Sequence, residues 1–139
     1  MWQLKLIKKS LYLVMFLLFA LNLVQNKGYS MEYNKTIAID LDCVLDEYIK
    51  YTDNIPPVRS GAREFIIKLA KDYKLILFTN RNPKQATEWL IQNNLNDYFD
   101  EVTNVKPIAS IYIDDRAVNF QGDYEKTLKE IENFKVWWK

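Results

Sequence analysis

The feature that most constrains the fold is a series of short apolar runs, each followed directly by acidic or polar residues. The runs cover residues 37–39, 75–78 and 111–113, and each is long enough for one buried strand. Segments with a helical pattern alternate with them, which predicts parallel strands joined by helices. We therefore expect an α/β fold, a three-layer Rossmann-like parallel sheet with helices on both faces.

Polar clusters occur in a fixed order along the chain. They hold Asp40 with Asp42, Thr79 with Asn80, Lys106, and Asp114 with Asp115. In parallel sheets, ligand sites lie just outside the carboxyl ends of the strands. The three clusters that follow strands should therefore meet at one edge, and Lys106 should reach that edge from the segment before the last strand.

The side chains in these clusters indicate phosphate chemistry supported by a cation. Four carboxylates at one edge repel one another unless a cation lies among them, and an all-oxygen site suits Mg²⁺. Lys106 and the Thr79 hydroxyl supply the positive charge and the donor that a phosphoryl group needs. The chain has no histidine, which excludes imidazole catalysis and histidine-bound zinc. An aspartate is then the expected nucleophile, acting through an aspartyl-phosphate.

This ordered set of residues resembles the haloacid dehalogenase (HAD) superfamily of Mg²⁺-dependent phosphohydrolases, over most of the chain from Thr36 to Asn119. The neighbouring residues resemble its small bacterial members. The segments concerned are Pro56-Pro57-Val58-Arg59-Ser60-Gly61-Ala62, Phe78-Thr79-Asn80-Arg81 and Tyr112-Ile113-Asp114-Asp115-Arg116.

The resemblance implies catalytic roles for the first pair of aspartates. Asp40 would attack phosphorus and bind Mg²⁺ through one oxygen. Asp42 would protonate the leaving oxygen and then activate water, and its backbone carbonyl would bind the metal. Cys43 departs from the pattern, because many relatives have glycine there.

The resemblance also implies binding roles for the other clusters. Thr79 would hydrogen-bond the phosphoryl oxygens, together with the Asn80 amide. Lys106 would neutralise the nucleophile and the phosphate. Asp114 would be the acidic metal ligand, and Asp115 would be a further ligand or would support one.

Each cluster also has a plainer interpretation. Aspartates at strand ends commonly form turns or cap helices. Thr79 and Asn80 could cap a helix that begins near Pro83. Arg81 and Arg116 could contact substrate, although a surface ion pair is the commoner role for such residues.

The order of the clusters disfavours one related function and leaves two others open. Receiver domains combine the same residue types, but there the lysine follows the threonine near the end of the domain, whereas here an acidic pair follows the lysine. A non-catalytic phosphate- or protein-binding module and a protein phosphatase are the alternatives. A looser likeness to 5′-deoxynucleotidases makes nucleotides one candidate among small phosphomonoester substrates.

The spacing of the clusters leaves no room for a cap domain. Between Asp40 and Thr79 it predicts a loop and one helix over 61–73, with Phe65, Leu69 and Ala70 on one face. Between Thr79 and Lys106 it predicts a helix over 84–93 and a short strand near 102. A last amphipathic helix is predicted over 124–134, and the apolar tail 136–138 is expected to pack against the sheet edge.

The first thirty residues form a separate segment, and we expect the phosphohydrolase domain to occupy residues 31–139. Lysines 5, 8 and 9 precede an apolar run from 11 to 24, which is typical of a signal peptide or membrane anchor. The alternative is a misassigned upstream start, with translation beginning at Met31 and a cytoplasmic protein. If residues 1–30 are translated, we expect the protein to be exported or anchored. A membrane is an expected partner only in that case.

The net charge limits the classes of binding partner that we expect. The whole chain has 19 Lys and Arg against 18 Asp and Glu, and four of the lysines lie in the first thirty residues. The remaining domain is mildly acidic, so we expect no long nucleic acid as a partner. A homo-oligomer stays open, and a single cysteine excludes a disulfide within the chain.

Overall fold

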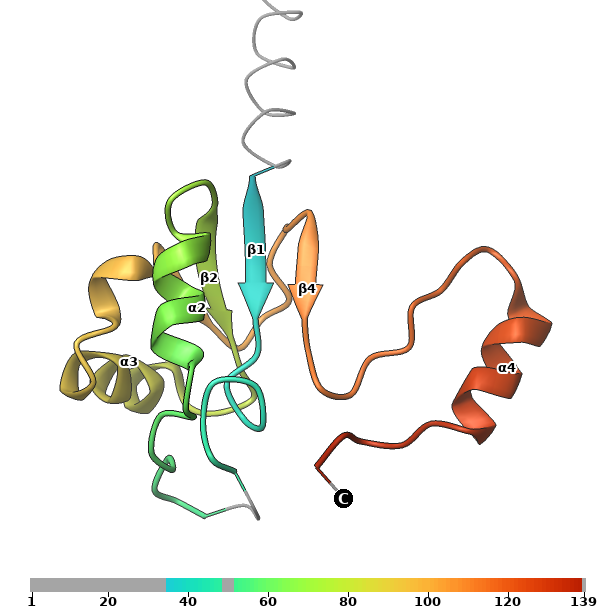
Figure 1. Cartoon of the computed structure of the whole chain (residues 1–139), viewed down its shortest axis with the longest axis horizontal. Helices are drawn as coiled ribbons and strands as arrows, with labels where there is room; N and C mark the ends of the chain where they lie inside the picture. The colour runs from blue at the N-terminus through green and yellow to red at the C-terminus, as the bar shows by residue number, and fades with distance from the viewer. Residues whose placement is uncertain (1–34, 49–51, 139) are drawn as a thin grey trace, which may run out of the picture. The chain divides into compact units, whose positions relative to one another are not determined.

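The computed structural model describes residues 35–48 and 52–138, which belong to one unit that begins at Lys35 (Figure 1). The expectations for residues 1–30 lie outside these ranges. Within the described ranges, no helix has both the length and the apolar character needed to span a bilayer.

A four-stranded sheet organises the unit, and all its strands are parallel. The strands are β1 (Thr36–Ile39), β2 (Lys74–Phe78), β3 (Glu101–Thr103) and β4 (Ile111–Ile113). Their order is β3-β2-β1-β4, so β1 lies between β2 and β4 (Figure 1). The predicted α/β fold is confirmed, including the short strand near residue 102, and the arrangement agrees with a Rossmann-like topology.

The core lies against one face of the sheet. Because side chains alternate along a strand, Ile37, Ile39 and their register partners Leu75 and Leu77 point to the same side. Helices α2 (Ala62–Leu69) and α3 (Pro83–Gln92) pack there. Each fully buried leucine or isoleucine contributes about 1.5–3 kcal/mol, which is enough to fix this face against the helices.

Helix α2 begins at Ala62, after Gly61 in the left-handed region at φ 84°, and it ends earlier than predicted. It buries Ala62 and Ile66, and Leu69 and Ala70 pack against the same cluster. These four positions are spaced i, i+4, i+7 and i+8, which is one face of a helix. Phe65 was expected on this face, but it points outward and is 39% exposed, so that part of the prediction is wrong.

Helix α3 has a different cap from the one expected. Its N-cap is Asn82, whose side chain accepts a hydrogen bond from the Lys84 N–H at 2.9 Å. Pro83 occupies the first turn, where its missing N–H costs nothing. Asn80 and Thr79 therefore do not cap α3, and their side chains remain available to the edge of the sheet.

Two further elements complete the unit. A 3-10 turn, η1 (Asn96–Tyr98), leads into β3. Helix α4 (Tyr124–Glu132) is capped by Asp123, which accepts from the Lys126 N–H at 3.0 Å. Its apolar residues Leu128 and Ile131 are 53% and 56% exposed.

Candidate functional site

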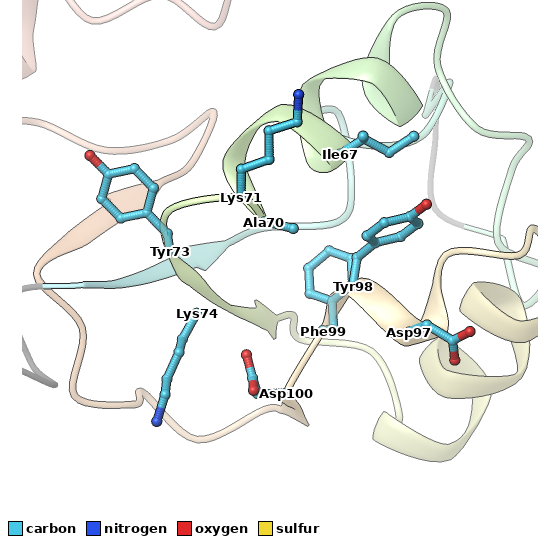
Figure 2. Close-up of a pocket in the computed structure, with 9 residues that line it drawn as sticks. All are labelled: Ile67, Ala70, Lys71, Tyr73, Lys74, Asp97, Tyr98, Phe99 and Asp100. Atoms are coloured by element: carbon cyan, nitrogen blue, oxygen red, sulfur yellow. The ribbon is translucent and has the colours of Figure 1, made fainter.

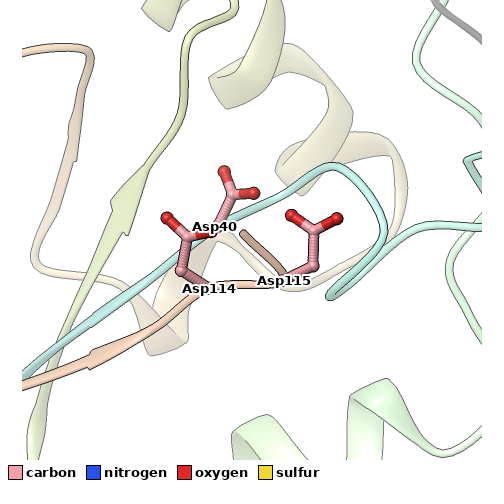
Figure 3. A group of neighbouring side chains, drawn as sticks. All are labelled: Asp40, Asp114 and Asp115. Atoms are coloured by element: carbon pink, nitrogen blue, oxygen red, sulfur yellow. The ribbon is translucent and has the colours of Figure 1, made fainter. Parts of the chain in front are cut away.

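Three carboxylates meet at the carboxyl ends of β1 and β4. Ile39 and Ile113 are register partners, and the Asp40 N–H donates to the Ile113 carbonyl at 2.9 Å, so Asp40 lies beside Asp114 and Asp115. One oxygen from each of these three side chains lies within 4.8 Å of the others (Figure 3). Three carboxyl groups this close, with oxygen as the donor atom of each, fit a divalent cation.

The pKa of Asp40 shows that its ionised form is disfavoured in this cluster. Burial raises the pKa of its carboxyl from 3.8 to about 7. A hydrogen bond from the Leu41 backbone opposes the rise, whereas the charges of Asp114, Asp42 and Asp115 add to it. A cation among these carboxylates would offset both the repulsion and part of the burial cost.

The cluster borders a cavity of about 310 Å³. Its lining residues are Asp40, Asp42, Tyr48, Phe78, Thr79, Asn80, Arg81, Asp114, Asp115 and Arg116. Six of the seven predicted site residues therefore lie around one hollow, which agrees with the expectation that strand ends converge.

Lys106 is the predicted site residue that does not line this cavity. Its ammonium lies 4.9 Å from the centre of the Tyr112 ring. Residues 104–110 form a loop, which was one of the two expected forms, and the Tyr112 hydroxyl donates to the Pro107 carbonyl at 2.5 Å. The loop thus holds Lys106 beside the Tyr112 ring, and Lys106 is not among the residues that line the cavity.

Arg81 holds the Asp42 carboxylate. Its Nε donates to both carboxylate oxygens of Asp42, at 2.8 and 3.1 Å, and its Nη2 lies 2.7 Å from Oδ1. Nη1 donates to the Thr52 carbonyl at 2.8 Å, which ties the site to the loop before α2. The Arg81 side chain is 3% exposed. From the sequence Arg81 was only a possible substrate contact, and nothing in the spacing indicates this pairing.

Thr79 is buried at the floor of the cavity, with 1% of its surface exposed. Its Oγ1 accepts a hydrogen bond from the Arg81 backbone N–H at 3.2 Å. A hydroxyl that accepts keeps its own proton to donate. Thr79 can therefore donate to an oxygen of a bound anion, and Asn80 lies exposed beside it.

A tight turn after β1 fixes Asp42. Cys43 has φ 67°, in the left-handed region that favours glycine, which accounts for the glycine common at this position in the family that the sequence resembles. Asp46 stabilises the turn, because its Oδ1 accepts from the N–H groups of Cys43 and Tyr48 at 2.9 and 3.1 Å. Burial, with a contribution from the charge of Asp42, raises the pKa of Asp46 to about 6. Asp46 was not among the predicted site residues.

A larger hollow of about 510 Å³ lies at the opposite end of the sheet, beside the first residue of β2 (Figure 2). Lys71, Lys74, Asp97 and Asp100 are its charged lining residues. Asp100 already accepts from the Leu75 N–H at 3.2 Å, which holds β2 in place. This hollow lies at the amino ends of the strands, so we place the functional site at the smaller, acidic cavity.

No protein-family model matches this chain, and no curated protein matches it. A solved structure of a conserved protein coded by a locus of Bacteroides thetaiotaomicron is similar to it. The two share 24% sequence identity with a TM-score of 0.51, over 75% of this chain and 94% of that one. This likeness supports the fold alone.

Proposed function

We propose that the protein is a HAD-type phosphatase, a Mg²⁺-dependent hydrolase of small phosphomonoesters that acts through an aspartyl-phosphate. The observation that carries the proposal is the meeting of Asp40, Asp114 and Asp115 within 4.8 Å, in a cavity also lined by Asp42 and Thr79. Their order along the sequence is the order that the resemblance requires.

The donor set fits Mg²⁺. Asp40, Asp114 and Asp115 would hold the ion, together with the Asp42 carbonyl that the resemblance implies. When bound, Mg²⁺ supplies positive charge to the phosphoryl oxygens and to the carboxylates around them. The raised pKa of Asp40 supports a cation at this position, because the nucleophile must be ionised near neutral pH.

The reaction follows from the placement of two aspartates on one turn. The Asp40 carboxylate attacks phosphorus, the new O–P bond forms, and the bond to the leaving oxygen breaks. Asp42 pairs with Arg81 as a carboxylate, so it must take up a proton from solvent before it can act as the acid. It then gives that proton to the leaving oxygen and later takes one from water, which attacks the acyl phosphate, breaks its bond to Asp40 and restores the Asp40 carboxylate. Arg81 orients the Asp42 carboxylate through its paired hydrogen bonds.

Hydrogen-bond donors that line the same cavity would bind the phosphoryl group. Thr79 and Asn80 line the cavity, and Arg116, whose side chain is half-exposed, lines it too. The Tyr48 ring also lines the cavity and offers a flat face to an aromatic leaving group such as a base. A volume of about 310 Å³ is at the lower end of the range for small-molecule sites, which favours a small phosphomonoester.

Hydrolysis of an aryl phosphate by the purified full-length protein tests the proposal. We expect turnover with Mg²⁺, none with EDTA, and a loss of at least 10³-fold in Asp40→Asn, because an amide cannot act as this nucleophile. A folded protein that binds Mg²⁺ without turning over any phosphate ester would favour the non-catalytic binding module. Normal turnover by Asp40→Asn would contradict the nucleophile assignment.

A further inference from the structure

The proposed reaction leaves two tryptophans near the end of the chain without a role. Trp138 lies beside the acidic cluster, and its indole Nε1–H donates to Asp115 Oδ2 at 2.6 Å. The Asp115 side chain is 3% exposed, so water competes little for this bond. The tail was expected to pack against the sheet edge, whereas the hydrogen bond of Trp138 goes to Asp115, a residue of the candidate metal site in the loop after β4.

Several contacts hold the indole ring in this position. The Arg116 guanidinium lies 5.5 Å from the centre of the Trp138 ring, and Tyr48 meets the ring edge-on with centroids 6.4 Å apart. Arg116 also contacts Asp115 Oδ2 through its Nε at 3.4 Å. The indole is thus flanked by two residues that line the same cavity as Asp115.

A second anchor lies one residue earlier. The Arg59 guanidinium is 4.4 Å from the centre of the Trp137 ring, and the same guanidinium donates to the Asp46 carbonyl at 2.8 Å. The tail is therefore attached both to the loop after β4 and to the loop after β1. Two anchors on different loops limit the ways in which Trp138 can leave Asp115.

We infer that Trp138 is a positioning residue that fixes the Asp115 carboxylate for cation binding. This inference rests on the proposed metal site. An indole N–H donates but carries no charge, so it orients the carboxylate and leaves the negative charge of Asp115 for the cation. Partners of this kind, which bond to a ligand and not to the metal, usually contribute 10–100-fold to metal affinity.

Calorimetric titration with Mg²⁺ alone tests the inference without any substrate. Trp138→Phe removes the N–H and keeps an aromatic ring. Trp137→Phe is the matched control, because it keeps the aromatic face that Arg59 contacts and so keeps this anchor of the tail. We expect Mg²⁺ affinity to fall about 10–100-fold in Trp138→Phe and to stay within about twofold in Trp137→Phe. In an Asp115→Asn background, Trp138→Phe should change the affinity no further, since its partner carboxylate is already gone.

The outcomes separate the inference from the function on which it rests. Unchanged Mg²⁺ affinity in Trp138→Phe, with normal binding by the unaltered protein, would overturn the role of Trp138 and leave the phosphatase proposal standing. No Mg²⁺ binding by the unaltered protein would overturn the metal site itself.

If the Trp138→Phe variant fails to fold, a measurement on the unaltered protein still tests the inference. The chain has four tryptophans, and the Trp138 indole proton can be assigned in NMR spectra by its proximity to the Tyr48 ring. We expect this resonance to move during Mg²⁺ titration, because its acceptor becomes a metal ligand, while the Trp89 indole, bonded to the Pro56 carbonyl, stays in place. A Trp138 resonance that stays fixed while Mg²⁺ binds would contradict the inference.

Discussion

Arg81 is the residue whose side chain does most to arrange the site. It is buried, it forms a forked pair with Asp42, and it also bonds the Thr52 carbonyl. A lysine at this position could not form the same fork, because an ammonium is a single point charge. The geometry therefore needs a guanidinium and not merely a positive charge.

We expect Arg81→Lys to lower kcat about 10–100-fold, because Asp42 would lose its fixed direction toward the leaving oxygen. KM should change much less, since Asp42 contacts the leaving group mainly in the transition state. Steady-state kinetics with an aryl phosphate measure both constants. Arg63→Lys is the control, because Arg63 bonds the Asn93 and Asn94 carbonyls and does not line the cavity. Equal kcat in Arg81→Lys and the unaltered protein would show that the fork is not needed.

Cys43 offers a second residue-scale prediction. Its side chain is 1% exposed, and burial, with a contribution from Asp115, raises the pKa of the thiol to about 11. The thiolate is the reactive form, so Cys43 should resist alkylation at pH 8 in the folded protein and react once guanidinium unfolds it. Since the chain has one cysteine, mass spectrometry after iodoacetamide treatment reads this site alone. Rapid labelling of the folded protein would contradict the buried turn.

At the scale of single elements, two asparagines at or near the start of α3 have different surroundings. Asn82 caps the helix, whereas Asn80 is exposed and lines the cavity. We expect Asn82→Ala to destabilise the protein by about 1 kcal/mol and to leave kcat nearly unchanged. Asn80→Ala should do the reverse, with little change in stability and weaker substrate binding. Thermal unfolding and kinetics on both variants decide between these roles, and a loss of stability in Asn80→Ala would contradict the assignment.

The elements also show how far the sequence predicts this fold. The apolar runs place β1, β2 and β4 correctly because a buried parallel strand needs an unbroken apolar segment. The register then brings Asp40 beside Asp114, since both follow paired residues. Phe65 was placed wrongly because Phe65 and Ile66 are both apolar and adjacent, so the pattern alone does not decide which one faces the sheet.

The rest of the site depends on the conformations of loops, which no local sequence pattern predicts. Lys106 stands in an extended loop beside Tyr112, where an ordinary helix was one of the two expectations. The pairing of Arg81 with Asp42 and the contact of Trp138 with Asp115 join segments far apart in the chain. Such contacts are set by the course of whole loops, and the sequence pattern indicates only how long those loops are.

At the scale of the whole molecule, the acidic cluster links pH to stability. The pKa of Asp40 is raised in the folded state from 3.8 to about 7, so ionising this group favours unfolding. Without a divalent cation, the contribution of Asp40 to the free energy of unfolding should therefore be highest below pH 4. It should fall as the pH rises toward 7. Asp40→Asn should remove this part of the pH dependence.

Mg²⁺ should reverse the loss where the carboxylates are ionised. We expect it to raise Tm by several degrees at pH 8 and by much less at pH 5, since 1 kcal/mol corresponds to about 4–8 °C for a domain of this size. Thermal scans at both pH values, with Mg²⁺ and with EDTA, measure the effect. Equal stabilisation at both pH values would point to Mg²⁺ binding elsewhere.

The order of the strands has a consequence for how the protein acquires its site. Asp40 follows the first described strand and Asp114 the last, and they become neighbours only when Ile37 pairs with Ile111. Contacts so distant in sequence usually form late, because a long loop must close first. A refolding chain should therefore gain its affinity for Mg²⁺ in the slowest folding step. The rate at which the ion binds during refolding would then report the rate at which β4 pairs with β1.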